Sequence, residues 1–155
     1  TVGNLLFFFF FGATTGFAAS GWLADRLGAA RVAFGGATLL VICLIGLALR
    51  PPLALIGLIN LLYGASAATS IVLLPQVRRL FPIGLTGRAV SAANLLAFSG
   101  IFVTQWAMGA MINRFGKDAA GHYPPQAYTV TLLVAAFITA ATLIGYWPIL
   151  KKSSA

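Results

Sequence analysis

The sequence predicts an all-α, polytopic membrane protein with five transmembrane helices. Of its 155 residues, 60% are hydrophobic and only 8% are charged. The charged residues are confined to short stretches between long apolar runs. A soluble domain carries about 25% charged residues, because it has a surface to present to water. This composition therefore favours a chain whose solvent is lipid.

Five apolar runs are each long enough to cross a bilayer. The hydrocarbon core, about 30 Å thick, requires roughly 20 apolar residues at 1.5 Å each. Each run is expected to form a helix, because backbone N–H and C=O groups in hydrocarbon must form hydrogen bonds within their own segment. The runs predict spans near residues 3–22, 32–49, 53–74, 89–113 and 127–149. Together they make one transmembrane domain over residues 1–155.

Breaker residues separate the spans. Two prolines directly after Arg50 predict a tight turn, since proline suits a helix start and denies continuation. Residues 75–88 are expected to form a longer link, broken by Pro82 and Gly84, with Thr86 as the N-cap of the fourth span.

Small-residue spacing predicts close helix packing in two spans. Gly12 and Gly16 lie four residues apart in the first span, and Gly57 and Gly64 mark the third. Glycine lets two backbones approach closely because it has no Cβ atom. These positions are expected to serve packing.

The polar loop over residues 114–126 contains the single histidine, His122. We expect it to have no carboxylate or cysteine nearby and therefore to be a solvated loop residue rather than a metal ligand. The single cysteine, Cys43, lies within a span, can form no internal disulfide and is expected to pack as a small side chain. No cofactor is expected.

Basic residues are divided unequally between the two sides of the membrane. One side carries Arg26, Arg31, Arg78, Arg79, Arg88, Lys151 and Lys152. The other carries Arg50, Arg114 and Lys117. The positive-inside rule places the richer side in the cytoplasm, with the N-terminus of this piece outside and the C-terminus cytoplasmic. Charges spread over several membrane ends favour topology and lipid headgroup contact over nucleic-acid binding.

The stretch GWLADRLGAARV, residues 21–32, concentrates charge and glycine between the first two spans and is expected to form a cytoplasmic loop. Gly21 is expected to allow close approach of a neighbouring helix, and Leu23 to make an apolar contact. Asp25 is placed to accept backbone N–H bonds or to face a helix N-terminus. Gly28 permits a sharp reversal. A plain structural turn whose charges set topology is the alternative interpretation.

This stretch resembles the signature loop of the major facilitator superfamily, G-x-L-A-D-R-x-G followed by basic residues. The matching residues are Gly21, Leu23, Ala24, Asp25, Arg26, Gly28 and Arg31. Ala29 and Ala30 depart from the strong form of the motif, as in the weaker copy between the family's eighth and ninth helices. Residues 81–109 are similar to the family's eleventh helix, with Phe-Pro, Gly-Arg, Asn, Gly, Gln-Trp and Gly in comparable order.

The resemblance implies that the five spans correspond to helices eight to twelve, an incomplete C-terminal half of such a bundle. The chain would then be a fragment of a longer secondary active transporter, a permease that moves a small solute by alternating access. It implies that Asp25 acts as a latch whose partner lies in the missing N-terminal half. It also implies an integral protein of a bacterial inner membrane.

The alternative is a non-transporting membrane interaction or assembly subunit that reuses a half-bundle. The sequence contains no catalytic triad, zinc-ligand cluster or phosphate-binding loop, so no enzyme is expected.

Polar residues within spans predict where a small-molecule substrate would bind. Asn94 and Gln105 lie eleven residues apart, which returns to within about 20° of the same helix direction, and Trp106 lies beside them. In the third span, Asn60 and Tyr63 lie near the middle of the membrane. Hydrogen bonding between or within helices is the alternative for such residues. No Asp, Glu, Lys, Arg or His lies within any predicted span.

Overall fold

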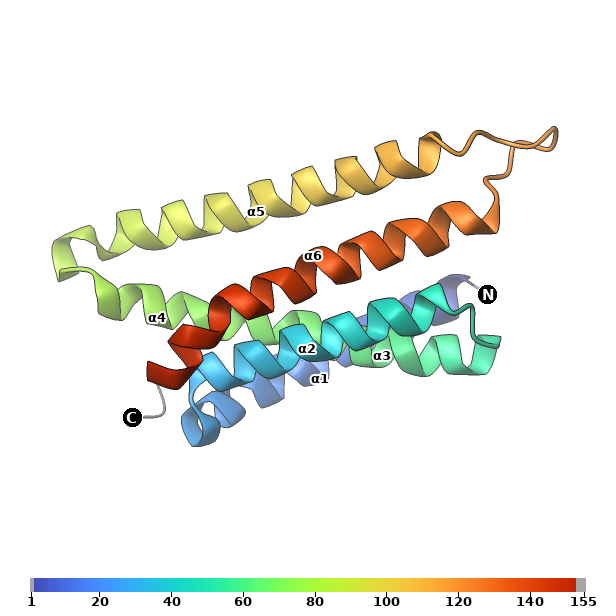
Figure 1. Ribbon diagram of the computed structural model, residues 1–155. Helices are drawn as coiled ribbons and strands as arrows, with labels where there is room; N and C mark the ends of the chain where they lie inside the picture. Colours follow the sequence, from blue (N-terminus) through green and yellow to red (C-terminus); the bar gives the residue numbers. More distant parts are fainter. Residues whose placement is uncertain (1, 153–155) are drawn as a thin grey trace. The chain divides into compact units, whose positions relative to one another are not determined.

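A computed structural model describes residues 2–152 and shows an all-helical chain in which no strand occurs within that range (Figure 1). The long helices are α1 (Val2–Leu27), α2 (Ala29–Ala48), α3 (Leu53–Ala68), α5 (Ile83–Asn113) and α6 (Pro125–Lys152). Two short elements, η1 (Thr69–Val72) and α4 (Leu73–Leu80), follow α3. Five segments are long and apolar enough to cross a membrane. The predicted fold class and the number of spans are therefore confirmed.

The chain divides into two compact units. Unit 1 comprises residues 1–73 and 132–155, which hold α1, α2, α3, η1 and most of α6. Unit 2 comprises residues 74–131, which hold most of α4, all of α5, the loop that follows it and the first turns of α6. The end of the predicted cytoplasmic tail, residues 153–155, lies outside the described residues.

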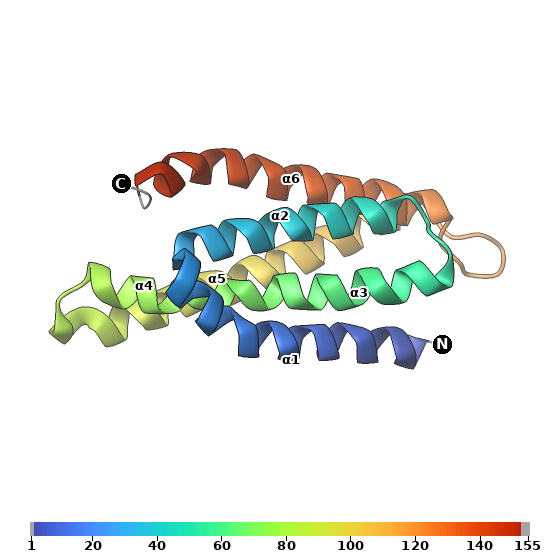
Figure 2. The ribbon, with the colours of Figure 1, turned by 90° about the horizontal axis from the view of Figure 1, so that it is seen from below.

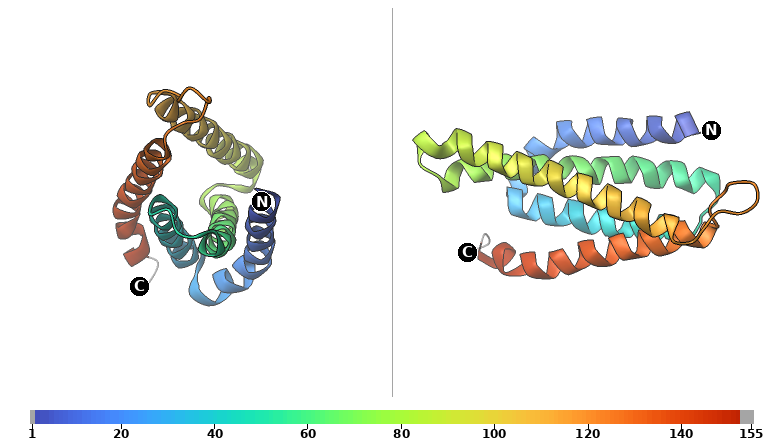
Figure 3. Two further views of the ribbon diagram at one scale, coloured as in Figure 1. Left: turned by 90° about the vertical axis from the view of Figure 1, so that its right-hand side faces the viewer. Right: turned by 90° about the horizontal axis from the view of Figure 1, so that it is seen from above.

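In unit 1, α3 lies between α1 and α2 (Figures 2 and 3). Glycine sets the approach of α1 to α3. A Cβ added at Gly12 would overlap the carbonyl oxygen of Leu61, and one added at Gly64 would overlap that of Phe9. A Cβ at Gly16 would lie 2.8 Å from the carbonyl oxygen of Ala65. The packing role predicted for these glycines is confirmed.

Gly57 and Gly36 extend this packing. A Cβ at Gly57 would meet the ring of Phe8 at 3.3 Å, an approach tighter than most real contacts. A Cβ at Gly36 of α2 would overlap the hydroxyl of Thr69. The closest contacts between the helices of unit 1 are thus made by glycines.

The predicted link over residues 75–88 is almost entirely helical, so that prediction is wrong. Only Phe81 and Pro82 lie outside α4 and α5. Pro75 sits in the first turn of α4, where its missing N–H is tolerated, and the 3₁₀ segment just before it replaces regular α-helix. Pro82 occupies the N-cap of α5. Thr86 is therefore a first-turn residue that donates to the carbonyl of Pro82, rather than the N-cap.

The predicted loop around residues 23–31 is likewise helical. α1 continues to Leu27 and α2 begins at Ala29, so Gly28 alone joins them with a φ of 87°. The reversal predicted at Gly28 is confirmed, because a positive φ is accessible to glycine at little cost. The loop prediction was wrong because every other residue of the stretch can adopt a helical backbone.

Candidate functional site

Asp25 lies in the last turn of α1, with its side chain exposed. Within the described residues it has neither an ion pair nor a hydrogen bond, so the predicted backbone N–H bonds to Asp25 are not formed. A carboxylate at a helix C-terminus faces the negative end of the helix dipole. Asp25 thus lies at the C-terminal end of α1 without an ion pair in the described chain.

The neighbouring residues of the motif do not pair with Asp25. The guanidinium of Arg26 lies over the ring of Trp22, with its Cζ atom 4.2 Å from the ring centroid. Arg31 is exposed in the first turn of α2, and Leu23 is half-buried. A Cβ at Gly21 would meet nothing within 4 Å, so the close approach predicted there is wrong in this structure. The close approaches are instead made by the glycines deeper in unit 1.

The two candidate cavity residues of unit 1 have structural partners. Asn60 is half-buried and its Nδ2 donates to the carbonyl of Ile56 at 2.8 Å. The ring of Tyr63 packs against Phe9 of α1, with 5.4 Å between the ring centroids. A hydrogen bond to the backbone of its own helix accounts for Asn60. Aromatic packing accounts for Tyr63.

The candidates of unit 2 are different. Asn94 and Gln105 of α5 are exposed, and in the described chain neither amide has a hydrogen-bond partner. Ser91, about 60° away on the helix, shares both properties. Trp106 is 68% exposed. An unpaired amide in hydrocarbon costs several kcal/mol, so this side of α5 requires water or a polar partner.

The loop after α5 holds an ordered structure that the sequence analysis missed. Asp118 Oδ1 accepts hydrogen bonds from the backbone N–H groups of Ala120 and His122, at 2.9 and 2.8 Å. His122 is exposed, as predicted, but its Nδ1 lies 3.8 Å from Asp118 Oδ1, so the expectation that it has no nearby carboxylate was wrong. An aspartate followed closely by a glycine is typical of such side-chain-capped turns, and this signal was present.

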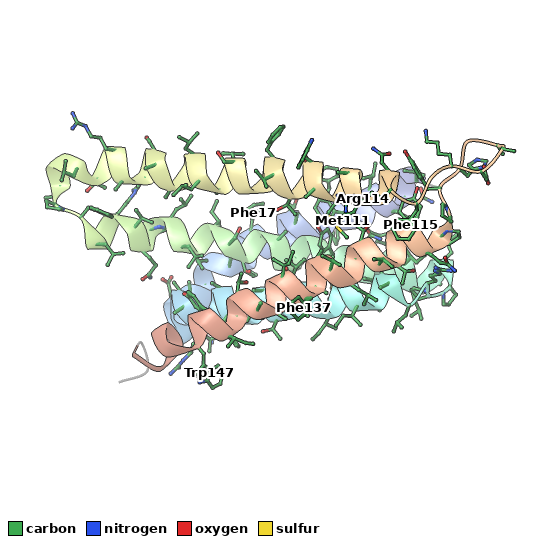
Figure 4. The ribbon with its side chains drawn as sticks, turned by 45° about the horizontal axis from the view of Figure 1, so that its top comes forward. Phe17, Met111, Arg114, Phe115, Phe137 and Trp147 are labelled. Carbon is green, nitrogen blue, oxygen red and sulfur yellow. The ribbon has the colours of Figure 1, made fainter. Side chains whose placement is uncertain are left out.

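Two further contacts hold the same loop to the end of α5. Tyr123 donates its hydroxyl hydrogen to Asn113, and the ammonium of Lys117 lies 5.0 Å from the centroid of the Tyr123 ring. Met111, Arg114 and Phe115 line a shallow depression beside it (Figure 4). The described residues contain no group of three or more His, Cys, Asp or Glu that could hold a metal ion.

Comparisons with known proteins add no assignment. No family model, no curated protein and no solved structure matches the chain.

Proposed function

We propose that the chain belongs to a secondary transporter of the major facilitator type, which moves a small solute by alternating access. The observation that carries the proposal is the polar side of α5. Asn94 and Gln105 are exposed and unpartnered in the described chain, on a 31-residue helix with no buried residue. A membrane helix keeps such amides where they face an aqueous path or a substrate.

The motif around Asp25 supports the same proposal. Its carboxylate is exposed, unpaired within the described residues and located at the unfavourable end of α1. A partner that offered N–H groups or a cation in one conformation only would stabilise that conformation. We propose that this partner lies in the other half of the transporter, on the cytoplasmic side of a bacterial inner membrane.

Cysteine accessibility tests the polar side of α5. In a Cys43→Ser background, Asn94→Cys and Gln105→Cys are treated with a charged, water-soluble thiol reagent. Leu96→Cys and Val103→Cys, on the opposite side of α5 by helix register, are the matched controls. We expect the first pair to react at least about tenfold faster, because a thiolate forms only where water reaches it.

The accessibility result also separates transport from assembly. Slow reaction at all four positions would contradict an aqueous path and favour an assembly subunit whose α5 packs against another protein. Protection of the Asn94→Cys or Gln105→Cys variant by an added solute would identify the transported class. For that purpose a panel of sugars, amino acids and organic cations is used.

Substitution at Asp25 tests the latch. Asp25→Asn in the complete protein should slow uptake by about tenfold, because a lost charge-assisted contact is worth about 1.5–3 kcal/mol in the conformation it stabilises. Membrane insertion should be unchanged. Asp118→Asn, at the other acidic residue of the chain, is the control and should transport normally. Equal uptake by Asp25→Asn and the unmodified protein would exclude the latch.

A further inference from the structure

A pocket in unit 1 lies between the first half of α2 and the last part of α6. Its volume is about 160 Å³. Ala33, Phe34 and Ala37 line it from α2, and Thr142 and Tyr146 line it from α6. Ala33 and Ala37 are one helical turn apart, and their small side chains leave the hollow.

The walls of the pocket are apolar except for one hydroxyl group that can donate a hydrogen bond to a ligand. Leu73 closes a further part of the wall. The hydroxyl of Thr142 donates to the carbonyl of Thr139, so it is already satisfied. The hydroxyl of Tyr146 has no hydrogen-bond partner among the described residues, although its side chain is half-buried. A ligand for this pocket is therefore an apolar group that carries a hydrogen-bond acceptor near one end.

The size of the pocket selects a short apolar segment. A protein cavity of about 150 Å³ holds a molecule of the size of benzene. The pocket thus has room for part of an acyl chain but not for a whole lipid. The carbonyl ester that joins an acyl chain to its headgroup is an acceptor that suits the Tyr146 hydroxyl.

The surroundings place the pocket at the level of lipid headgroups. Phe34 of the pocket wall packs against Trp147, with ring centroids 5.8 Å apart, and Trp147 lies near the end of α6 (Figure 4). Tryptophan and tyrosine are enriched where hydrocarbon meets headgroups. Arg31 is exposed and one turn before Phe34 on α2, and the end of α6 bears Lys151 and Lys152.

Charge decides which lipid suits this end of unit 1. Its residues include Arg26, Arg31, Lys151 and Lys152 but only one acidic residue, Asp25. The chain itself does not supply enough anions to balance these cations. Arginine pairs strongly with phosphate, and an anionic headgroup is favoured next to several basic residues.

From the pocket, the aromatic pair and the charge we infer that this site binds an anionic phospholipid. One acyl chain occupies the pocket, its ester meets Tyr146, and its phosphate lies near Arg31. The inference does not depend on the transported solute or on the proposed latch.

Quenching of Trp147 fluorescence tests the site. Trp22→Phe and Trp106→Phe make Trp147 the single tryptophan of the chain. The protein is reconstituted in vesicles that contain dibrominated phosphatidylglycerol or dibrominated phosphatidylcholine. We expect the apparent affinity for phosphatidylglycerol to be about fivefold higher, the factor contributed by one cation near an anionic surface. Equal quenching by the two lipids would overturn the inference.

Three variants separate the parts of the site. Arg31→Gln should abolish the preference for phosphatidylglycerol, and Ala37→Leu should fill the pocket and lower quenching by both lipids. Ala141→Leu, at an exposed position of α6 next to the lining residue Thr142, should leave quenching unchanged. If Ala37→Leu and Ala141→Leu behave alike, the acyl-chain site is excluded. Arg31 is exposed, so its variant tests the headgroup contact even if a pocket variant fails to fold.

Discussion

The α1–α3 pair and α5 are both long apolar helical segments, yet they meet their surroundings in opposite ways. α1 and α3 approach so closely that Gly12 and Gly64 touch the backbone of the facing helix. α5 has no buried residue, and a Cβ added at Gly100 or Gly109 would meet nothing within 4 Å. The same composition therefore supports a self-sufficient interface in one region and a surface that requires lipid, water or protein in the other.

The difference lies in where small residues fall, because hydrophobicity alone gives membrane helices no reason to associate. Lipid tails are as apolar as leucine, so close packing between helices supplies the stability. In α1 and α3, glycines of each helix face the backbone of the other helix. Within unit 2, a Cβ added at any glycine of α5 would meet nothing within 4 Å, and the amides of Asn94 and Gln105 have no hydrogen-bond partner in the described chain.

The largest expected effect is at the glycine contact. Gly12→Ala should lower the free energy of unfolding by about 1–3 kcal/mol, because the new methyl group must push Leu61 and α3 away. Gly35→Ala in α2, where a Cβ would meet nothing within 4 Å, is the control. It should be neutral or stabilising by up to about 1 kcal/mol, since alanine favours a helix. Unfolding in mixed detergent micelles measures both values, and equal destabilisation by the two would refute the close contact.

A smaller effect is expected at the aromatic contact between the same helices. Phe9→Leu removes the ring that packs on Tyr63 and should lower the free energy of unfolding by about 0.5–1.5 kcal/mol. Trp106→Leu on α5 makes a matched aromatic-to-leucine change at a position 68% exposed. It should change stability by less than about 0.5 kcal/mol. If Trp106→Leu lowered the free energy of unfolding more than Phe9→Leu, α5 would be the more tightly packed region, contrary to the structure.

A local effect is expected in the loop after α5. Asp118→Ala removes the acceptor for the N–H groups of Ala120 and His122. Each bond is worth about 1 kcal/mol, so the exchange of these two amide hydrogens should accelerate by about fivefold. Asp118→Asn retains an acceptor oxygen and should preserve most of the protection. Hydrogen exchange followed by mass spectrometry gives the rates, and unchanged exchange in the alanine variant would show that the turn is held by other contacts.

The smallest effect on stability is expected at the polar side of α5. Asn94→Leu removes an amide that has no hydrogen-bond partner in the described chain. The free energy of unfolding should therefore change by less than about 0.5 kcal/mol, while uptake of solute falls. The same detergent unfolding assay provides the measurement, with Leu95→Ala as a control for side-chain size at an exposed neighbour. A loss above about 2 kcal/mol would mean that Asn94 is a packing residue.

Sequence reasoning located the helices better than their ends. Runs free of charge locate spans because a charge in hydrocarbon is costly, but charge does not stop a helix. α1 therefore continues through Asp25 and Arg26 to Leu27, and α4 carries Arg78 without interruption. The true breaks lie at Gly28, which tolerates a positive φ, and at Pro82, which fixes φ and has no N–H group.

For the candidate site, the sequence located the polar residues within the spans. It did not show which of their side chains have a hydrogen-bond partner and which do not. Asn60 and Asn94 are the same residue type within apolar helices, and nothing local distinguishes them. In the structure, the Asn60 amide donates a hydrogen bond to the carbonyl of Ile56, whereas the Asn94 side chain is exposed. Likewise Tyr146, which the sequence left without a role, lines a pocket only because α6 brings it next to Ala33 and Ala37.

The sequence by itself determined that this chain is helical and embedded in a membrane, because lipid leaves a long apolar segment no alternative to internal hydrogen bonding. It also determined the reversal at Gly28 and the small residues available for packing. Only the tertiary structure decided which glycines touch a backbone, which amides remain free and where a pocket opens. These depend on which faces of distant helices meet, and composition and spacing along one segment carry no information about the facing helix.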